Sequence, residues 1–200
     1  MLSPPQKPLL LQLPSEIALQ VTPKQFTALA AANRELRLER TATGELIVNP
    51  PTGGETGQRN FNINTQLGIW VAAHKSLGVA FDSSTGFELP NGANRSPDAS
   101  WIRQERWQTL TPQQREGFIP LCPDFVVELR SKTDSLKKLQ AKMQEYRDNG
   151  TALGWLINPH NQRVEIYRLG QAVEKLEQPQ SLSGETVLPS FTLELTEIWA

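Results

Sequence analysis

The stretch PDFVVELRSKTDSLKKLQAKMQEYRDNGTALGWLINP, residues 123–159, carries the clearest structural signals in this 200-residue chain. Its segment FVVEL (125–129) is β-branched and apolar around one carboxylate, which predicts a buried strand. A helix is expected from about Asp134 to Asn149, because Gly150 is a typical residue to end it. ALGWLIN (152–158) is predicted to be a second buried strand. These elements form the centre of the expected domain.

Upstream of this centre, the sequence predicts a helix, a hairpin and a longer helix. TPKQ (22–25) has a threonine cap, a proline at the first helical position and a capping-box glutamine, so a helix should begin there and end near Asn33. LRLER (36–40) and ELIVN (45–49) should pair around the turn TATG. Apolar residues then recur at helical spacing from about Thr56 to Leu77.

The remaining segments are short. The extended ones are VAFD (79–82), FELP (87–90), DASWI (98–102), VEIYRLG (164–170), QAVEKLE (171–177) and FTLEL (191–195). The polar stretch 103–117 is expected to be a helical turn and a loop. The order of hairpin, helix, strands, helix and strands predicts one mixed α/β (α+β) domain over residues 21–200. A Pro- and Leu-rich, irregular arm is expected over residues 1–20.

Composition excludes several classes of protein. With 38% hydrophobic residues the chain can build a core, so it is not fully disordered. No apolar run approaches the roughly 18 residues of a membrane span, and the N-terminus lacks the features of a secretory signal. The single cysteine, Cys122, excludes an internal disulfide and a multi-cysteine zinc site. We therefore expect a cytoplasmic protein without a membrane partner.

Charge is nearly balanced over the whole chain but not along it. Twenty basic and 21 acidic residues give a net charge of −1, so the chain as a whole is not a polycation that binds nucleic acid. Residues 130–148, however, hold six basic and three acidic residues. This surplus permits a basic face, although most charge runs are simply solvated surface.

Two carboxylates on neighbouring strands are the best candidates for chemistry. Asp98 stands in SPDAS (96–100) at the start of a strand, and Glu128 stands inside the buried strand VVEL. Such a pair, with a nearby ammonium, can hold Mg²⁺ and activate water against a phosphodiester. The alternatives are that Glu128 forms a salt bridge with an arginine and that Asp98 only caps a turn. A buried glutamate is costly unless it is paired, protonated or metal-bound.

Asp124 is the rival of Asp98, since it also follows a proline. It lies on the same strand as Glu128 but four residues away, roughly 13 Å along an extended chain. One Mg²⁺ cannot take both side chains as ligands without a bend in the strand. Asp124 is therefore interpreted as a strand-entry residue.

A helical wheel selects the lysine. Leu136, Leu139, Met143 and Tyr146 define a buried stripe, and Lys142 lies about 40° outside it at 100° per residue. Lys142 can therefore extend along the edge of the core toward Glu128, unless it is an ordinary solvated lysine. Arg130 competes with it, because positions 128 and 130 share a strand face. A guanidinium binds phosphate well but serves poorly in proton transfer.

The runs NRELRLERTATGELIVNPPTGGETG, RSPDASWI and residues 123–159 together resemble the Uma-two family of the PD-(D/E)XK restriction-endonuclease-like superfamily. The resemblance covers about Val21 to the C-terminus. It implies a central mixed sheet flanked by helices, with Asp98 and Glu128 as the metal-binding pair and Glu39 at the family's early acidic position. The superfamily usually places a lysine two residues after the glutamate, where this chain has Arg130. The family's lysine then corresponds to Lys142 in KMQEY.

These observations lead to two hypotheses. In the first, the protein is a Mg²⁺-dependent endonuclease on DNA, with Mn²⁺ as a substitute. Asp98 and Glu128 bind the metal, Lys142 positions water or stabilises charge, and Glu39 binds a second metal or a metal-bound water. In the second, the protein is a non-catalytic module that binds nucleic acid or protein with the same fold. Arg130, and Arg59 and Asn60 beside the Gly-rich PTGGETG, are candidate phosphate contacts. A homodimer is expected from the two sites that cleavage of a duplex needs.

Overall fold

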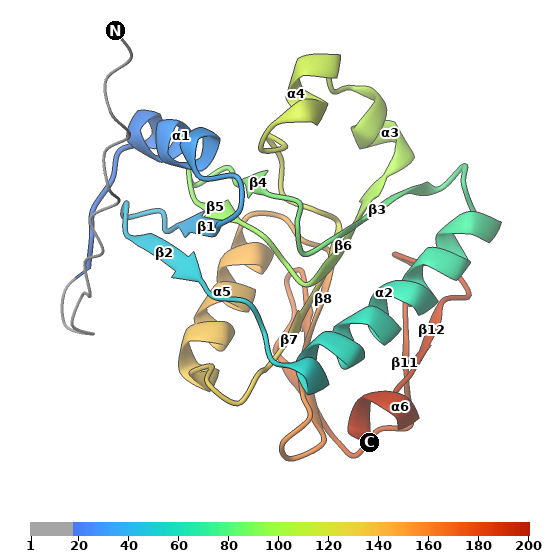
Figure 1. Ribbon diagram of the computed structural model, residues 1–200. Coiled ribbons are helices and arrows are strands. Elements are labelled where there is room, and N and C mark those ends of the chain that lie inside the picture. Colours follow the sequence, from blue (N-terminus) through green and yellow to red (C-terminus); the bar gives the residue numbers. More distant parts are fainter. Residues whose placement is uncertain (1–17) are drawn as a thin grey trace, which may run out of the picture.

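The structure is a computed structural model that describes residues 18–200 (Figure 1). The helices are α1 (Pro23–Ala32), α2 (Gly54–Ala73), α3 (Gln104–Gln108), α4 (Pro112–Glu116), α5 (Leu136–Asp148) and α6 (Thr196–Trp199). The strands are β1 (Arg37–Arg40), β2 (Leu46–Asn49), β3 (Gly78–Asp82), β4 (Phe87–Glu88), β5 (Asn94–Arg95), β6 (Ala99–Arg103), β7 (Phe125–Leu129), β8 (Leu153–Asn158), β9 (Arg163–Arg168), β10 (Glu174–Glu177), β11 (Ser181–Ser183) and β12 (Thr192–Glu194).

A mixed sheet forms the centre of the molecule. Its strand order is β10-β9-β8-β7-β6-β3. Only the pair β7 and β8 is parallel in this sheet, and the other neighbours are antiparallel. Parallel neighbours need a long crossover connection, and α5 provides it. The helix between the two central strands therefore lies against the sheet.

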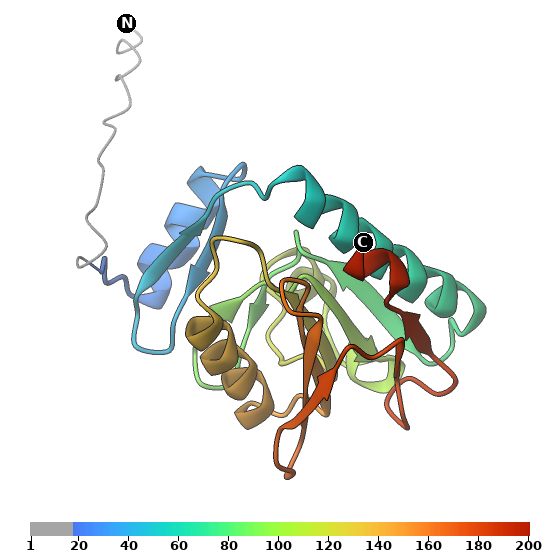
Figure 2. The same ribbon diagram turned by 90° about the horizontal axis from the view of Figure 1, so that it is seen from below.

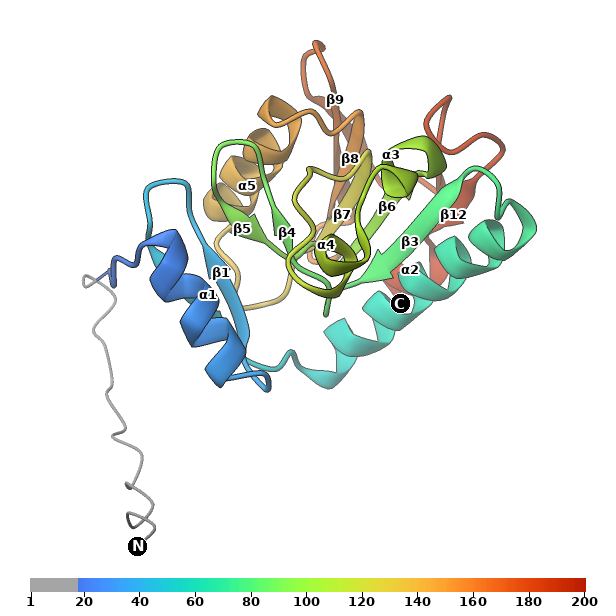
Figure 3. The same cartoon turned by 90° about the horizontal axis from the view of Figure 1, so that it is seen from above.

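The two faces of the sheet are covered by different elements. Figures 1–3 show α5 on one side of the sheet, and α2, α6 and the β11–β12 hairpin on the other. Side chains alternate along β7: Phe125, Val127 and Leu129 join the core with α2, whereas Val126 joins the core with Met143 and Tyr146 of α5. Glu128 follows Val126 by two residues, so it faces α5.

A second, smaller sheet lies beside α5. Its order is β2-β1-β5-β4, and Figures 2 and 3 show it together with α1 at one side of the central sheet. Leu19 accepts a hydrogen bond from the backbone of Leu46 at 2.7 Å, and Gln20 forms a bridge with Glu45. Residues 19–20 of the expected arm thus extend the β1–β2 hairpin, and residues 1–17 of that arm lie outside the described part.

Most expected elements are present, but some bounds differ. The strand expected over 171–177 begins at Glu174, and the stretch 103–117 contains two short helices, α3 and α4, rather than one helical turn. Thr22 and Gln25 form the predicted capping box of α1. The long helix α2 ends at Ala73 rather than near Leu77, because the backbone N–H of His74 turns back to Val71 at 3.0 Å. The short elements β5, β11 and α6 were not expected, since two to four residues show no hydrophobic period.

Within residues 18–200, no helix combines the length and the apolar character that a membrane span requires.

Candidate active site

A pocket of about 610 Å³ lies where β1, the start of α2 and the β7–α5 connection meet. It contains the predicted Glu39, Asp98, Glu128 and Lys142, and the predicted Arg59 and Asn60 also line it. Its charged lining residues are Arg37, Glu39, Glu55, Arg59, Asp98, Glu128, Lys132, Asp134 and Lys142. Side chains from distant parts of the sequence are therefore gathered in one cavity.

Asp98 is fixed to the end of β7 by its backbone and its side chain. Its N–H donates to the carbonyl of Val127 at 3.0 Å, and its Oδ2 accepts from the backbone N–H of Leu129 at 2.8 Å. Its Oδ1 is 3.9 Å from the Arg37 guanidinium. Burial raises the pKa of the Asp98 carboxyl above its usual value, although the Leu129 N–H opposes this shift. Within residues 18–200, Oδ1 therefore has only the long ion pair with Arg37 and receives no hydrogen bond.

Glu128 is buried, and its partners in the described part of the chain contact only one of its two carboxylate oxygens. Its Oε1 lies 2.7 Å from Lys142 Nζ and accepts from the Tyr146 hydroxyl at 3.1 Å. Within residues 18–200, its Oε2 receives no hydrogen bond. Burial raises the pKa of Glu128 to about 7 against the effect of Lys142, and the carboxylates of Asp98 and Glu39 add to the rise.

Lys142 is held between two carboxylates. From α5, its Nζ lies 2.7 Å from Glu128 Oε1 and 2.8 Å from Glu39 Oε1, and it donates to the Ser96 carbonyl at 3.3 Å. Burial alone would lower the pKa of Lys142, but Glu128 and Glu39 outweigh it and raise that pKa above its usual value. The amine therefore stays an ammonium at neutral pH.

Glu39 has a partner on each oxygen. Oε1 accepts from Lys142 and from the Ser96 N–H at 3.1 Å, and Oε2 is 3.2 Å from Arg95. Burial raises the pKa of Glu39, but the two cations outweigh burial and bring that pKa below its usual value. Both oxygens of Glu39 therefore contact protein groups, whereas Asp98 and Glu128 each have one oxygen that accepts no hydrogen bond in the part of the chain that the structure describes.

The three predicted phosphate contacts are placed differently. Arg130 follows the end of β7, donates to the Asp134 carbonyl at 3.3 Å and does not line the pocket. Arg59 lines the rim, and its guanidinium donates to the Ala200 carbonyl at 2.7 Å. Asn60 also lies on the rim and accepts from the Asn64 amide at 3.0 Å.

Asp124 lies outside this pocket, at the opposite end of β7. Its Oδ2 accepts the Arg103 N–H at 2.9 Å, and its Oδ1 is 3.0 Å from the Arg106 guanidinium. Both of its oxygens are thus engaged by protein groups.

Sequence reasoning missed several charged residues around the site. Arg37 precedes Glu39 by two residues on β1, so strand alternation could have placed both on one face. Glu145 follows Lys142 by three residues, and helical spacing could have linked them in the same way. Arg95 and Lys132 lie in short or irregular segments, where no period gives a signal.

The donor set suits a hard divalent cation. No group of three or more His, Cys, Asp or Glu side chains gathers as a metal site within residues 18–200. The pocket is instead lined by two carboxylates, Asp98 and Glu128, each with one oxygen that receives no hydrogen bond from the described part of the chain. Mg²⁺ is commonly held by one or two carboxylates and keeps several waters. The residues present therefore fit such an ion.

Comparisons with known proteins agree with this fold. A solved structure, described as a "putative nuclease belonging to DUF820" from Anabaena variabilis ATCC 29413, is similar at 22% identity and a TM-score of 0.68. The match covers 81% of this chain and 89% of that chain. It supports the expected fold class, a mixed sheet flanked by helices.

Other comparisons add less. A chain of the DrdV–DNA complex matches at 10% identity over 62% of this chain and 12% of that chain. Its TM-score of 0.36 is too low to bear on fold or function. None of the curated proteins matches this chain.

The family model Uma2, described as "Putative restriction endonuclease", matches residues 23–196. This range includes every element from α1 to β12 and every residue of the candidate site. The resemblance found in the sequence is confirmed, and the chain belongs to the Uma2 family of restriction-endonuclease-like proteins.

Proposed function

We propose that this protein is a Mg²⁺-dependent endonuclease that hydrolyses phosphodiester bonds in DNA, with Mn²⁺ as a possible substitute. One observation carries the proposal: Asp98 and Glu128 line the same pocket as the Lys142 ammonium, and each has one carboxylate oxygen that receives no hydrogen bond from residues 18–200. Membership of a family described as restriction endonucleases supports DNA as the substrate.

Asp98 and Glu128 are the proposed metal ligands. Both are acceptor-only groups when ionised, and both are held by backbone or side-chain hydrogen bonds that leave one oxygen free. When bound, the ion would polarise the phosphoryl group and supply a nucleophilic water at neutral pH. Because burial raises the pKa of Glu128, its carboxyl group would have to lose a proton before it could hold the ion at acidic pH.

Lys142 is proposed to stabilise negative charge. Because its raised pKa keeps it protonated, it can donate hydrogen bonds but cannot accept a proton from water. Its Nζ is fixed by Glu39 and Glu128 before substrate binds, which is the preorganisation that charge stabilisation requires. We assign Glu39 to holding Lys142 rather than a second ion, since protein cations engage both of its oxygens.

Cations at the rim are proposed to contact the DNA backbone. Arg37, Arg59 and Lys132 line the pocket together with the Asn60 amide, and guanidinium groups bind phosphate oxygens in a bidentate manner. Arg130 does not line the pocket, so its predicted role as a phosphate contact has less support. A cytoplasmic location and a homodimer with two cleaving sites remain predictions.

Cleavage of supercoiled plasmid and of short duplexes, with Mg²⁺ or Mn²⁺ and with chelator, tests the proposal. We expect metal-dependent cleavage by the wild-type protein and none by Glu128→Gln. Calorimetry with Mn²⁺ should show saturable binding to the wild type and loss of binding in Glu128→Gln. Lys138→Met on the exposed side of α5 is the matched control for Lys142→Met, which should lower the rate while Mn²⁺ binding persists.

The non-catalytic module is the other outcome of the same experiment. DNA binding that falls steeply with salt, without Mn²⁺ binding and without cleavage by the wild type, would replace the enzyme by that module.

A further inference from the structure

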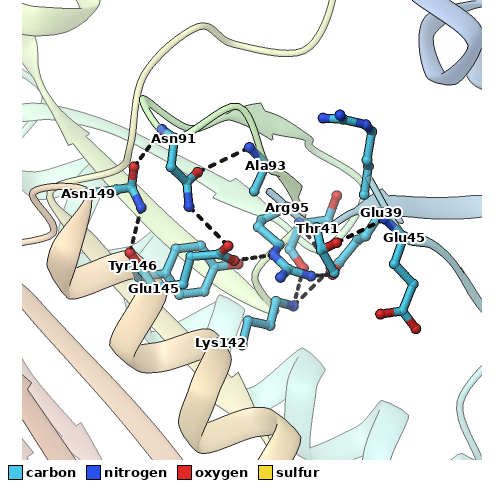
Figure 4. Close-up of polar contacts among 12 residues, drawn as sticks. Glu39, Thr41, Glu45, Asn91, Ala93, Arg95, Lys142, Glu145, Tyr146 and Asn149 are labelled. Carbon is cyan, nitrogen blue, oxygen red and sulfur yellow. Dashed lines mark hydrogen bonds and ion pairs between the residues drawn. The ribbon is translucent and has the colours of Figure 1, made fainter. Parts of the chain in front are cut away.

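A series of buried charges leaves α5, crosses the small sheet and returns to α5 (Figure 4). Arg95 Nε donates to Glu145 Oε2 at 2.5 Å, and Arg95 Nη1 lies 3.2 Å from Glu39 Oε2. Glu39 Oε1 then accepts from Lys142 Nζ at 2.8 Å. Glu145 follows Lys142 by three residues, so both ends of the series lie on neighbouring turns of one helix.

The charges in this series are removed from solvent. Arg95 is 7% exposed and Glu39 is 3% exposed, and the side chains of Lys142 and Glu145 are 13% and 15% exposed. Breaking a buried ion pair leaves an uncompensated charge, which is strongly unfavourable. Each member of the series therefore restricts the position of the next.

A second contact holds the same part of α5. The turn between β4 and β5 contains Asn91, whose N–H donates to Asn149 Oδ1 at 2.8 Å. The Asn91 amide also donates to Glu145 Oε1 at 3.1 Å. Both oxygens of Glu145 are thus bound by the small sheet or its turn, and these contacts join α5 to the sheet that contains β1.

The seating of α5 matters because Lys142 is not on the strand of Glu128. When a lysine stands two residues after the glutamate, the backbone of one strand sets their separation. Here Lys142 lies fourteen residues after Glu128 and on another element. Its place beside Glu128 depends on how α5 docks. Met143 and Tyr146 pack α5 into the core under the central sheet, and the Arg95–Glu145 ion pair ties the same helix to the small sheet.

We propose that Arg95, anchored by Glu145, is a positioning residue that holds Glu39 and thereby sets Lys142 beside Glu128. This inference rests on the proposed nuclease function of the pocket. Arg95 does not line that pocket, so it acts through Glu39 and contacts neither the substrate nor the metal-binding oxygens.

Kinetics of the full-length variants Arg95→Met, Arg95→Lys and Glu145→Gln test the proposal. Arg95→Met should lower kcat by about 100-fold, because a small displacement of an aligned group costs about that much. KM and Mn²⁺ affinity should stay near wild type, since Arg95 contacts neither ligand. Arg95→Lys should restore part of the rate, and Glu145→Gln should lower kcat by about 10-fold.

Arg168→Met is the matched control. Arg168 is also a part-buried arginine between two carboxylates, Glu174 at 2.7 Å and Glu185 at 2.6 Å, but it lies on β9 and does not line the pocket. Its kcat should equal that of the wild type. If Arg95→Met fails to fold, Glu145→Gln and Arg95→Lys carry the comparison. Equal kcat in these variants and the control overturns the inference.

A crystal structure of the Arg95 and Glu145 variants gives a readout independent of activity. Lys142 Nζ should leave its position between Glu39 and Glu128. If Lys142 stays in place, the inference is wrong even where kcat falls. If the wild type cleaves no DNA, the proposed function fails. The crystal structures of the variants then still show whether Arg95 determines the position of Lys142.

Discussion

The Pro-Asp dipeptide occurs twice in the antiparallel β6–β7 pair, at Asp98 and at Asp124, and the two aspartates occupy equivalent positions at opposite ends. Each donates its backbone N–H to a carbonyl of the partner strand at 3.0 Å. Each side chain also accepts a backbone N–H from that strand, at 2.8 Å and 2.9 Å respectively. The local motif thus builds the same structure twice.

The surroundings of the two aspartates differ. Asp124 lies 3.0 Å from the Arg106 guanidinium and 3.6 Å from that of Arg103. The nearest guanidinium to Asp98 is that of Arg37 at 3.9 Å, and Asp98 shares its pocket with Glu128. The motif therefore places a carboxylate at a strand end, and the cations around it decide whether an oxygen remains free for a ligand.

The largest expected effect is on cleavage. Asp98→Asn should lower the rate by about 1,000-fold, because it removes one of the two carboxylates proposed to hold the ion that stabilises developing negative charge. Asp124→Asn keeps the same shape at the other strand end and should retain the wild-type rate. Plasmid cleavage with Mg²⁺ measures both. Equal losses in the two variants would show that the contrast has no functional meaning.

The second effect is on stability. Here substitution of Asp124 should have a larger effect than substitution of Asp98, the reverse of the expectation for cleavage. Asp124→Ala should lower the free energy of unfolding by about 2 kcal/mol, since the Arg103 N–H loses its acceptor and two guanidiniums, 42% and 36% exposed, lose ion pairs that solvent screens. Asp98→Asn should cost little, because its carboxylate is poorly compensated. Urea unfolding followed by fluorescence measures both. A larger loss for Asp98→Asn would contradict the interpretation.

The third effect is on the pH dependence of stability. The folded-state pKa of Glu128 is raised to about 7 from 4.5, so the folded protein holds this proton more tightly than the unfolded chain. That contribution is present at low pH and is lost as pH rises through about 7. Relative to Glu128→Gln, the wild type should lose on the order of 2 kcal/mol between pH 5 and 8.

Thermal unfolding of both proteins across this pH range, without divalent ions, measures the difference. Mn²⁺ at pH 8 should restore stability to the wild type alone, because Glu128→Gln lacks one of the two carboxylates proposed to hold the ion. A difference that does not change with pH would refute the raised pKa.

The smallest expected effect is on DNA binding. It compares an arginine inside the pocket with one outside it, as the two aspartates were compared. Arg59 lines the pocket, whereas Arg130 donates to the Asp134 carbonyl outside it. Arg59→Gln should weaken DNA binding several-fold and reduce the slope of log K against log salt by about one. Arg130→Gln should leave that slope unchanged. Fluorescence anisotropy with a labelled duplex at several salt concentrations distinguishes the two residues.

Local patterns predicted much of the fold. FVVEL and ALGWLIN show by composition alone that they are buried strands, and the capping box at Thr22 fixes the start of α1. The end of α2 was placed too late, because the apolar period continues to Leu77 although the backbone turns at His74. The strands β5 and β11 depend on tertiary contacts, which no local pattern contains.

The candidate site was predictable only in part. Spacing on one strand excluded Asp124 as a partner of Glu128, and the helical wheel singled out Lys142. The same reasoning kept Arg130 as a competitor, because strand alternation puts positions 128 and 130 on one face, whereas β7 ends at Leu129. The link from Arg95 to Glu39 and Glu145 joins three elements, and only their packing in space brings these charges together.

The ion pair between Glu39 and Lys142 spans 103 positions of the chain. During synthesis, β1 leaves the ribosome long before α5. Glu39 therefore cannot form its ion pair with Lys142 until the intervening chain has been made. Contacts between such distant segments form late and slow the folding of a domain. Pairing of Glu39 with Lys142 is therefore expected to be one of the slower steps in the folding of this domain.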